Sequence, residues 1–332
     1  MPDFARKIAV WQRRHGRHGL PWQGTKDPYR IWVAEIMLQQ TQVEAVVPYF
    51  RRFLLRFPDL QALARASQGQ VLELWSGLGY YARARNLHAA AKRIAAEGEF
   101  PATVEELCRL PGIGRSTAGA IAAFAFGRRA AILDGNVKRV LARCFGARSE
   151  KRQWQLAERL LPGRGVPAYL QGLMDLGATL CTRLQPACGR CPVAKDCVAL
   201  REGRVGELPV PRERKPLPLR RSTWFVLLHK GSVLLEHRPG SGIWGGLWAF
   251  PEMKPGGFEA KIVKKIPAVM HGFTHFRLRA EPLICQVRKL PPRAESPAYC
   301  WFKIAAAARS AVPAPVRELL LALLQDESAQ QA

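Results

Sequence analysis

The sequence lacks any apolar run that approaches the roughly 18 residues of a membrane-spanning helix, which argues against an integral membrane protein. The start of the chain is basic, with Arg6 and Lys7, but the apolar core of a signal peptide does not follow. We therefore expect no secretory signal and a cytoplasmic location. In a reducing compartment the eight cysteines are not expected to form disulfides.

Acidic residues are scarce. The sequence has 26 Asp and Glu residues and 51 Lys and Arg residues, which gives a formal net charge of +25. The excess is shared, with 31 basic against 16 acidic residues in 1–203 and 20 against 10 in 204–332. A positive charge of this size in both halves favours a polyanionic partner such as nucleic acid. The alternative is a proteome in which most proteins are basic.

The length of 332 residues suggests about two domains. Residues 1–203 show helical periodicity, broken by Gly and Pro, and Asp27-Pro28 is typical of a helix start. Residues 204–221 contain a run with four prolines and predict a stiff, extended linker. Residues 222–332 favour strands, with a hairpin turn at Lys230-Gly231. The other expected elements are strands at 273–278, 283–287 and 298–304 and a closing helix at 313–324.

The segment 110–119, Leu-Pro-Gly-Ile-Gly-Arg-Ser-Thr-Ala-Gly, predicts a tight hairpin between two helices, at about 104–126. Gly112 and Gly114 allow a sharp turn and close approach of a ligand to the backbone. The second helix would then begin near Ser116 with free N–H groups, which suit a phosphate. An ordinary helix–helix turn is the alternative.

Four cysteines fall within seventeen residues, with the spacing Cys-x6-Cys-x2-Cys-x5-Cys. Such clustering in an intracellular chain predicts a metal site, and zinc is the general expectation. Arg183, Arg190 and Lys195 lie in or beside these loops, so a folded loop would present cations to a phosphate backbone. The four residues are Cys181, Cys188, Cys191 and Cys197.

Two carboxylates stand out by their surroundings. Glu35 lies in an apolar and amide-rich segment, and burial would raise its pKa toward the value that a general acid needs at neutral pH. Asp134 precedes Gly135-Asn136, where it could simply cap the following helix. Two carboxylates about one glycosidic bond are the recurrent arrangement for glycosyl cleavage.

Taken together, residues 1–200 resemble the helix–hairpin–helix DNA glycosylases, and the cysteine spacing is similar to that of their endonuclease III and MutY branch. Longer motifs resemble the MutY-type adenine DNA glycosylases. They are found at 20–22, 35–43, 77–83 and 133–140. The resemblance implies an all-α glycosylase domain with a [4Fe–4S] cluster, in place of zinc, on the loop 181–197. It also implies a bacterial-type, nucleoid-associated enzyme, which we expect to be a monomer.

The resemblance further implies roles for individual residues. Glu35 would protonate N7 of adenine, ionised Asp134 would stabilise the cationic sugar, and Asn136 would orient Asp134 or water. Gln40 and Tyr80 would enter the base stack, and Trp22 and Asp175 would border the adenine pocket. Core packing for Trp22, and a helix cap or ion pair for Asp175, are the alternatives.

One position separates two kinds of enzyme. Bifunctional relatives carry an attacking Lys where this chain has Ser116, and a hydroxyl cannot form a Schiff base. The expected activity is therefore monofunctional: hydrolysis of adenine from A:8-oxoguanine or A:G mispairs in duplex DNA, leaving an abasic site. Lys138, close to Asp134 in the chain, could trap the opened sugar incidentally.

Residues 222–332 resemble the NUDIX-like domain that follows the glycosylase domain in MutY, giving an α+β fold. The Glu-rich helix of a working NUDIX enzyme is missing, so phosphohydrolysis is not expected. Phe273-Thr274-His275 is similar to the Phe-Ser-His loop that reads 8-oxoguanine, with Thr in place of the usual Ser. The hydroxyl is kept, so its hydrogen bond can be kept as well. A solvated strand is the alternative.

Two other functions deserve comparison. Removal of thymine or oxidised pyrimidines would fit a Lys at position 116, which is absent, and would not need the second domain. A non-catalytic DNA-binding scaffold would not need both Glu35 and Asp134 within complete motifs.

Overall fold

The structure is a computed structural model, which describes residues 2–210, 216–256, 258–290 and 298–331. The chain divides into two compact units, and neither is continuous in sequence. Unit 1 comprises Met1–Ala64 and Ala89–Glu213, and unit 2 comprises Arg65–His88 and Arg214–Ala332. None of the described helices combines the length and apolarity needed to cross a bilayer.

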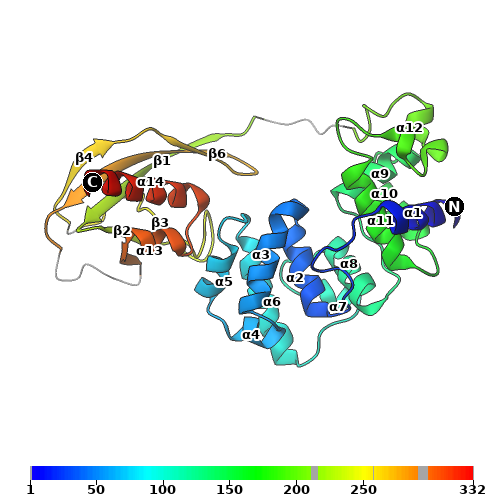
Figure 1. The fold of residues 1–332 in the computed structure, drawn as a ribbon, viewed down its shortest axis with the longest axis horizontal. Helices are drawn as coiled ribbons and strands as arrows, with labels where there is room; N and C mark the ends of the chain where they lie inside the picture. The colour runs from blue at the N-terminus through cyan, green and yellow to red at the C-terminus, as the bar shows by residue number, and fades with distance from the viewer. Residues whose placement is uncertain (1, 211–215, 257, 291–297, 332) are drawn as a thin grey trace. The chain divides into compact units, whose positions relative to one another are not determined.

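Unit 1 is helical, as the periodicity of the first 203 residues predicts (Figure 1). Its core joins α1, α8, α9, α10 and α11 around side chains such as Ile8, Val140 and Tyr169, each fully buried. Its helices are α1 (Pro2–His15), α2 (Pro28–Leu38), α3 (Val43–Arg56), α4 (Leu60–Arg65), α7 (Val104–Leu107), α8 (Arg115–Phe126), α9 (Gly135–Phe145), α10 (Glu150–Arg159), α11 (Val166–Thr179) and α12 (Val198–Arg201).

The N-terminal part of unit 2 is helical too. It contains α5 (Gln68–Trp75) and the first turns of α6 (Ala82–Glu97), which continues into unit 1. Ser67 caps α5: its hydroxyl accepts a 3.2 Å hydrogen bond from the amide of Gln70, whose side chain accepts one from the amide of Ser67 at 3.0 Å. This reciprocal pair fixes where α5 begins.

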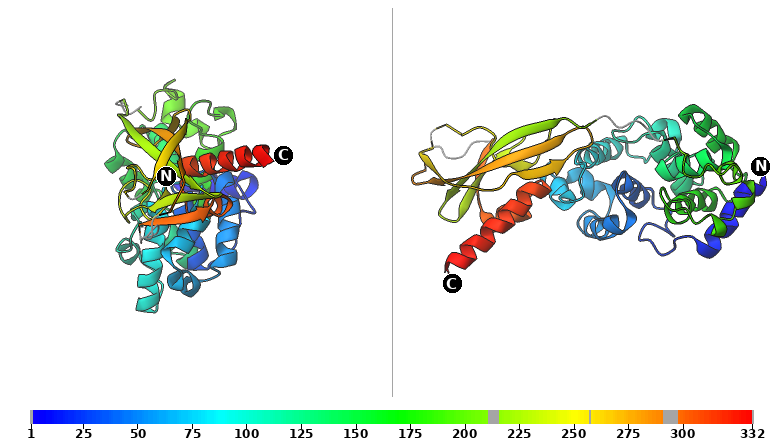
Figure 2. Two further views of the ribbon diagram at one scale, coloured as in Figure 1. Left: turned by 90° about the vertical axis from the view of Figure 1, so that its left-hand side faces the viewer. Right: turned by 90° about the horizontal axis from the view of Figure 1, so that it is seen from above.

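The C-terminal part of unit 2 is a mixed sheet with two helices. β1 and β2 form the expected antiparallel hairpin, whereas β1 and β6 run parallel and lie side by side in the views of the ribbon (Figures 1 and 2). The elements are β1 (Leu219–His229), β2 (Ser232–His237), β3 (Trp248–Ala249), β4 (Ala260–Lys265), β5 (Val269–Gly272), β6 (Arg277–Val287), β7 (Tyr299–Lys303), α13 (Ile304–Arg309) and α14 (Ala314–Gln331).

Three expected elements differ from the structure. Residues 273–276 form a turn between β5 and β6 rather than the start of a strand, because the Phe273 amide donates to the Phe276 carbonyl at 2.9 Å. The two short strands expected at 273–278 and 283–287 are one strand, β6, which passes through Pro282. Of the expected linker, 211–215 lie outside the described residues, and 219–221 already belong to β1.

Candidate active site

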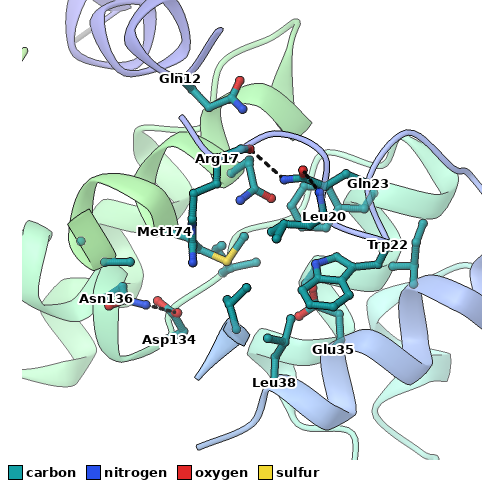
Figure 3. A pocket seen from close by; sticks show the side chains of 18 of the residues that line it. Gln12, Arg17, Leu20, Trp22, Gln23, Glu35, Leu38, Asp134, Asn136 and Met174 are labelled. Carbon is teal, nitrogen blue, oxygen red and sulfur yellow. Dashed lines mark hydrogen bonds between the residues drawn. The ribbon is translucent and has the colours of Figure 1, made fainter. Parts of the chain in front are cut away.

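Unit 1 contains a cavity of about 1320 Å³ that brings together the two carboxylates singled out in the sequence. Glu35 and Asp134 both line it, from α2 on one side and the N-terminus of α9 on the other (Figure 3). Trp22, Ser116 and Asn136 line it as well. Residues almost 100 positions apart in the chain therefore face one space.

Glu35 is placed by α2, which begins as predicted: the Asp27 carboxylate accepts a 2.9 Å hydrogen bond from the Tyr29 amide, and Pro28 is the first helical residue. The neighbours of Glu35 on α2, Ala34 and Ile36, are buried. The Glu35 side chain is half-buried at the cavity, and desolvation, with a smaller contribution from the charge of Asp134, raises its pKa to about 7. At neutral pH this group holds its proton in a large share of the molecules.

Asp134 caps α9, so the structural alternative is correct and is compatible with a place in the cavity. One carboxylate oxygen accepts a 2.7 Å hydrogen bond from the Val137 amide, and the other accepts from the Asn136 side-chain amide at 3.2 Å. Burial raises the pKa of Asp134, and these hydrogen bonds lower it in part. The pKa of Glu35 carries no such opposing contribution.

The segment before Asp134 is held by α8. The Ser116 hydroxyl accepts a 2.9 Å hydrogen bond from the Leu133 amide, so this side chain supports the backbone next to Asp134. Gly119 makes the approach feasible, because a Cβ there would lie 2.2 Å from the Ala131 carbonyl oxygen. On the opposite side Gly177 of α11 does the same, since its Cβ would lie 2.6 Å from the Cβ of Asn136. No role was predicted from the sequence for either glycine, although Gly119 closes the segment 110–119.

Arg139, which was also missed, joins this site to the cysteine-rich loop. Its Nη2 donates to the Asn136 side chain at 2.8 Å and to the Gly177 carbonyl at 2.6 Å. Its Nε donates to the Cys181 carbonyl at 2.6 Å. The side chain of Asn136 is therefore fixed between Arg139 and Asp134.

Trp22 lies above Glu35 at the cavity (Figure 3), with its ring edge-on to Phe50 at 5.4 Å between centroids. Asp175 is fully buried and does not line the cavity itself. It accepts 2.7 Å and 2.9 Å hydrogen bonds from the Arg17 side chain and amide, and another at 2.9 Å from Gln171. The ion-pair alternative for Asp175 is thus observed, and Arg17 is the residue that brings this pair to the cavity wall.

The predicted hairpin lies between α7 and α8. Gly112 has a φ of +77°, which favours glycine, and Gly114 begins α8 without a side-chain cap. The first turn of α8 therefore keeps backbone donors for a ligand. The Gln39 side chain at the end of α2 donates to the Gly112 carbonyl at 3.3 Å and to the Thr117 hydroxyl at 3.1 Å. The hairpin is thereby tied to the helix that carries Glu35.

Gln40 and Tyr80, the two residues expected to enter the base stack, share a strained backbone. Their φ values are +57° and +51°, in the left-handed region that side chains other than glycine rarely adopt. Tyr80 is 48% exposed, with the Arg83 guanidinium 5.3 Å from its ring centroid. Such strain in exposed residues is typical of functional positions.

The turn that contains Phe273, Thr274 and His275 presents two exposed residues. Thr274 and His275 face solvent, whereas the Phe273 ring stacks on Phe276 with 4.3 Å between centroids. The Trp244 ring lies 5.7 Å from that of Phe273. A rigid aromatic support thus carries an exposed hydroxyl and an exposed imidazole.

The four clustered cysteines line one small cavity beside α9 and α11. Cys181 lies 3.5 Å from Arg143 Nη1, and Arg143 also donates to the carbonyls of Thr182, Arg183 and Leu208 at 2.6, 3.0 and 2.8 Å. In the described part of the chain no three His, Cys, Asp or Glu side chains are arranged to hold a single metal ion. Four thiols around one cavity are a donor set that suits a metal centre, whether a single ion or an iron–sulfur cluster.

Comparison with known proteins matches two separate parts of the chain to two families. Residues 33–162 match the HhH-GPD superfamily of base excision DNA repair proteins, and residues 223–322 match the NUDIX domain family. An adenine DNA glycosylase from Buchnera aphidicola is 34% identical over 337 residues, which cover 96% of both chains. A thermostable thymine-DNA glycosylase has a TM-score of 0.56 at 29% identity, covering 60% of this chain and 96% of that one. An endonuclease III in a DNA complex has a TM-score of 0.53 at 21% identity, covering 60% of this chain and 95% of that chain, and it shows the fold alone.

Proposed function

Because the chain belongs to the adenine DNA glycosylases of base-excision repair, we propose that it removes adenine opposite 8-oxoguanine or guanine and leaves an abasic site. DNA is its substrate. One observation carries the proposal: Glu35 and Asp134 face the same cavity, and the pKa of Glu35 is raised to about 7. Two carboxylates in two protonation states are what acid-assisted cleavage of a glycosidic bond needs.

Adenine within a duplex is out of reach of this cavity, so the nucleotide must be extruded. We assign Gln40 and Tyr80 to the gap left in the stack, with Tyr80 beside 8-oxoguanine. The backbone donors after Gly112 and Gly114 would bind the phosphates next to the gap. Trp22 and the Arg17–Asp175 pair would border the adenine. These assignments rest on the positive φ values, the uncapped start of α8 and the residues around the cavity.

In the proposed reaction Glu35 donates its proton to N7, and the bond between adenine and C1′ breaks with its electron pair going to the base. The sugar becomes cationic, and ionised Asp134 stabilises it. Asn136, held by Arg139, keeps the Asp134 carboxylate in place. Adenine leaves as a neutral base, because the proton on N7 balances the electron pair that it takes. A water molecule then adds to C1′ and passes its proton to the Glu35 carboxylate, which leaves an abasic site and restores Glu35.

We further propose that the enzyme is monofunctional. Ser116 occupies the place of an attacking lysine, and its hydroxyl is engaged by the Leu133 amide. The Lys138 amine, the nearest alternative in sequence, is paired with Glu150 at 2.9 Å. A Schiff base at Lys138 would first require that this ion pair open.

Two further assignments complete the proposal. The turn with Phe273, Thr274 and His275 reads 8-oxoguanine, because it presents an exposed hydroxyl on a rigid aromatic support. A [4Fe–4S] cluster would be held by Cys181, Cys188, Cys191 and Cys197. Its role would be structural, because it would fix the loop that carries Arg183, Arg190 and Lys195. The monomeric state and the nucleoid-associated, cytoplasmic location stay predictions.

A gel assay with three duplexes tests the proposed function: adenine opposite 8-oxoguanine, adenine opposite guanine, and thymine opposite guanine. We expect strand breaks from the first two, only after alkali, because hydrolysis alone leaves the backbone intact. Breaks without alkali would refute the monofunctional assignment. Cleavage of the thymine duplex with no cleavage of the adenine duplexes would refute the proposed base specificity.

A further inference from the structure

Unit 2 joins two segments that are far apart in the chain and that both carry proposed contacts to the damaged base. Arg65–His88, with Tyr80, belongs to the same compact unit as residues 214–332, with the turn at 273–276. Tyr80 and Thr274 are separated by almost 200 residues. Their relative placement therefore depends on side chains that join α5 and α6 to the sheet.

Two sets of hydrogen bonds make this junction. At the end of α5 the Ser76 hydroxyl donates to the Val312 carbonyl at 2.6 Å and accepts from Arg317 at 2.8 Å. At the start of α6 the Arg85 Nη1 donates to the Gly245 carbonyl at 2.7 Å. Arg85 lies five residues after Tyr80, on the helix that begins just beyond it.

The segment Trp244-Gly245-Gly246 is packed on both sides. Toward the helices a Cβ at Gly246 would lie 3.1 Å from Leu72 and 3.2 Å from Gln68, so this backbone lies close against α5. On the other side the Trp244 ring lies 5.7 Å from Phe273 and 5.9 Å from His271. Trp244 itself has a φ of +56°, a strained conformation that its surroundings must hold.

We propose that Arg85 is a positioning residue for recognition of 8-oxoguanine. Its hydrogen bond to the Gly245 carbonyl holds the Trp244 ring against Phe273, and this fixes the turn with Thr274 in register with Tyr80. The inference rests on the proposed function, in which Tyr80 and Thr274 address the same oxidised base. Arg85 acts through Trp244 and not through contact with the base.

The test compares single-turnover excision of adenine opposite 8-oxoguanine with excision opposite guanine by the full chain. We expect Arg85→Ala to lower the ratio of the two rates about tenfold, the scale of one hydrogen bond from a charged donor. Arg85→Lys keeps a donor of similar reach and should restore most of the ratio. Lys92→Ala, which removes a charge from an exposed position of the same helix, should leave it unchanged.

Two further measurements separate positioning from other roles. In a Thr274→Val background, which removes the reading hydroxyl, Arg85→Ala should lower the ratio by less than twofold, since both changes affect one contact. Hydrogen exchange at the Phe273 amide should become faster in Arg85→Ala, because the support of its turn is loosened. Unchanged exchange, or rates that fall equally on both duplexes as for a phosphate contact, would overturn the proposal.

Failure of the underlying function gives a different result. If wild type and Thr274→Val showed the same ratio, the turn would not read 8-oxoguanine, and this part of the proposed function would be wrong whatever Arg85→Ala does. If Thr274→Val lowered the ratio and Arg85→Ala did not, recognition by the turn would stand and the role of Arg85 would be refuted.

Discussion

Glu35 and Asp134 line one cavity from two different helices, and the charge of Asp134 adds to burial in raising the pKa of Glu35 to about 7. Asp134, also raised in pKa by burial, keeps hydrogen bonds from Val137 and Asn136 that favour its ionised form. In the proposed mechanism Glu35 is therefore the acid that gives up a proton to the base, and Asp134 is the carboxylate that acts in its ionised form.

Excision should depend on pH with a bell-shaped profile. Above pH 7 the rate should fall, approaching tenfold per pH unit, as Glu35 loses the proton that it must donate. On the acid side the rate should fall as Asp134 is protonated, at a pH above the usual range of an aspartate. Single-turnover rates measure both limbs.

Glu35→Gln should bind the duplex but fail to excise adenine. Near-normal turnover by this variant would remove Glu35 from the acid role.

The same group should reduce stability at neutral pH. Between about pH 4.5 and 7 the folded protein holds the Glu35 proton more tightly than the unfolded chain, so unfolding becomes easier as pH rises. Glu35→Gln cannot titrate, and its gain in unfolding free energy over wild type should grow by up to about 3 kcal/mol between pH 5 and pH 8. Denaturant unfolding at the two pH values measures the difference. If the gain were equal at the two pH values, the pKa of Glu35 would not be raised in the folded protein.

The two roles of Asp134 can be separated by two substitutions. Asparagine is as good a helix cap as aspartate, so Asp134→Asn should leave the unfolding free energy within about 0.5 kcal/mol while abolishing excision. Asp134→Ala should abolish excision and also lose about 1 kcal/mol of stability with the cap. Calorimetry and single-turnover assays on both variants provide the readouts. Substantial excision by Asp134→Asn would mean that its charge is not needed.

Much of this site follows from local sequence signals. The Asp27-Pro28 start of α2, the glycines of the hairpin and the acid in an apolar segment each act over a few residues, and each was found in the expected element. The place of these residues as DNA contacts stays a prediction. No role was predicted for Arg139, Gly119 or Gly177, because their importance comes from tertiary contacts, which a single sequence does not display.

The turn at 273–276 in unit 2 is another feature that the sequence pattern did not predict. Alternating apolar residues predicted a strand through Phe273, but a hydrogen bond between the ends of the turn closes the chain there. The grouping of Arg65–His88 with 214–332 has no local sequence signal at all, since it depends on contacts such as Arg85 with Gly245.

Thr274→Val should isolate the contribution of the reading hydroxyl. The substitution keeps the shape of the exposed side chain and removes its hydrogen bond, so excision opposite 8-oxoguanine should fall about tenfold while excision opposite guanine is unchanged. Thr274→Ser keeps the hydroxyl and should retain the preference. An equal loss on both duplexes would mean that the residue acts on folding or on general DNA affinity.

Substitution of two arginines near the clustered cysteines should distinguish a structural role from a DNA-binding role. Arg143 is buried and donates to the carbonyls of Thr182, Arg183 and Leu208, so Arg143→Met leaves three acceptors without this donor. Loss of these bonds should loosen the loop and reduce the iron content of purified protein severalfold. Arg190 is exposed, and Arg190→Met should keep the iron content.

The two substitutions should affect DNA affinity differently: Arg190→Met directly, and Arg143→Met only through the loop. Arg190→Met should weaken binding to every duplex alike and reduce the salt dependence by about one phosphate contact. Arg143→Met should weaken binding only to the extent that iron is lost, because its side chain faces carbonyls and not solvent. Iron analysis and binding isotherms at several salt concentrations, measured on the same preparations, distinguish the two. If Arg143→Met kept full iron and lost DNA affinity, the arginine would act at the DNA surface, and the structural role assigned to it would be wrong.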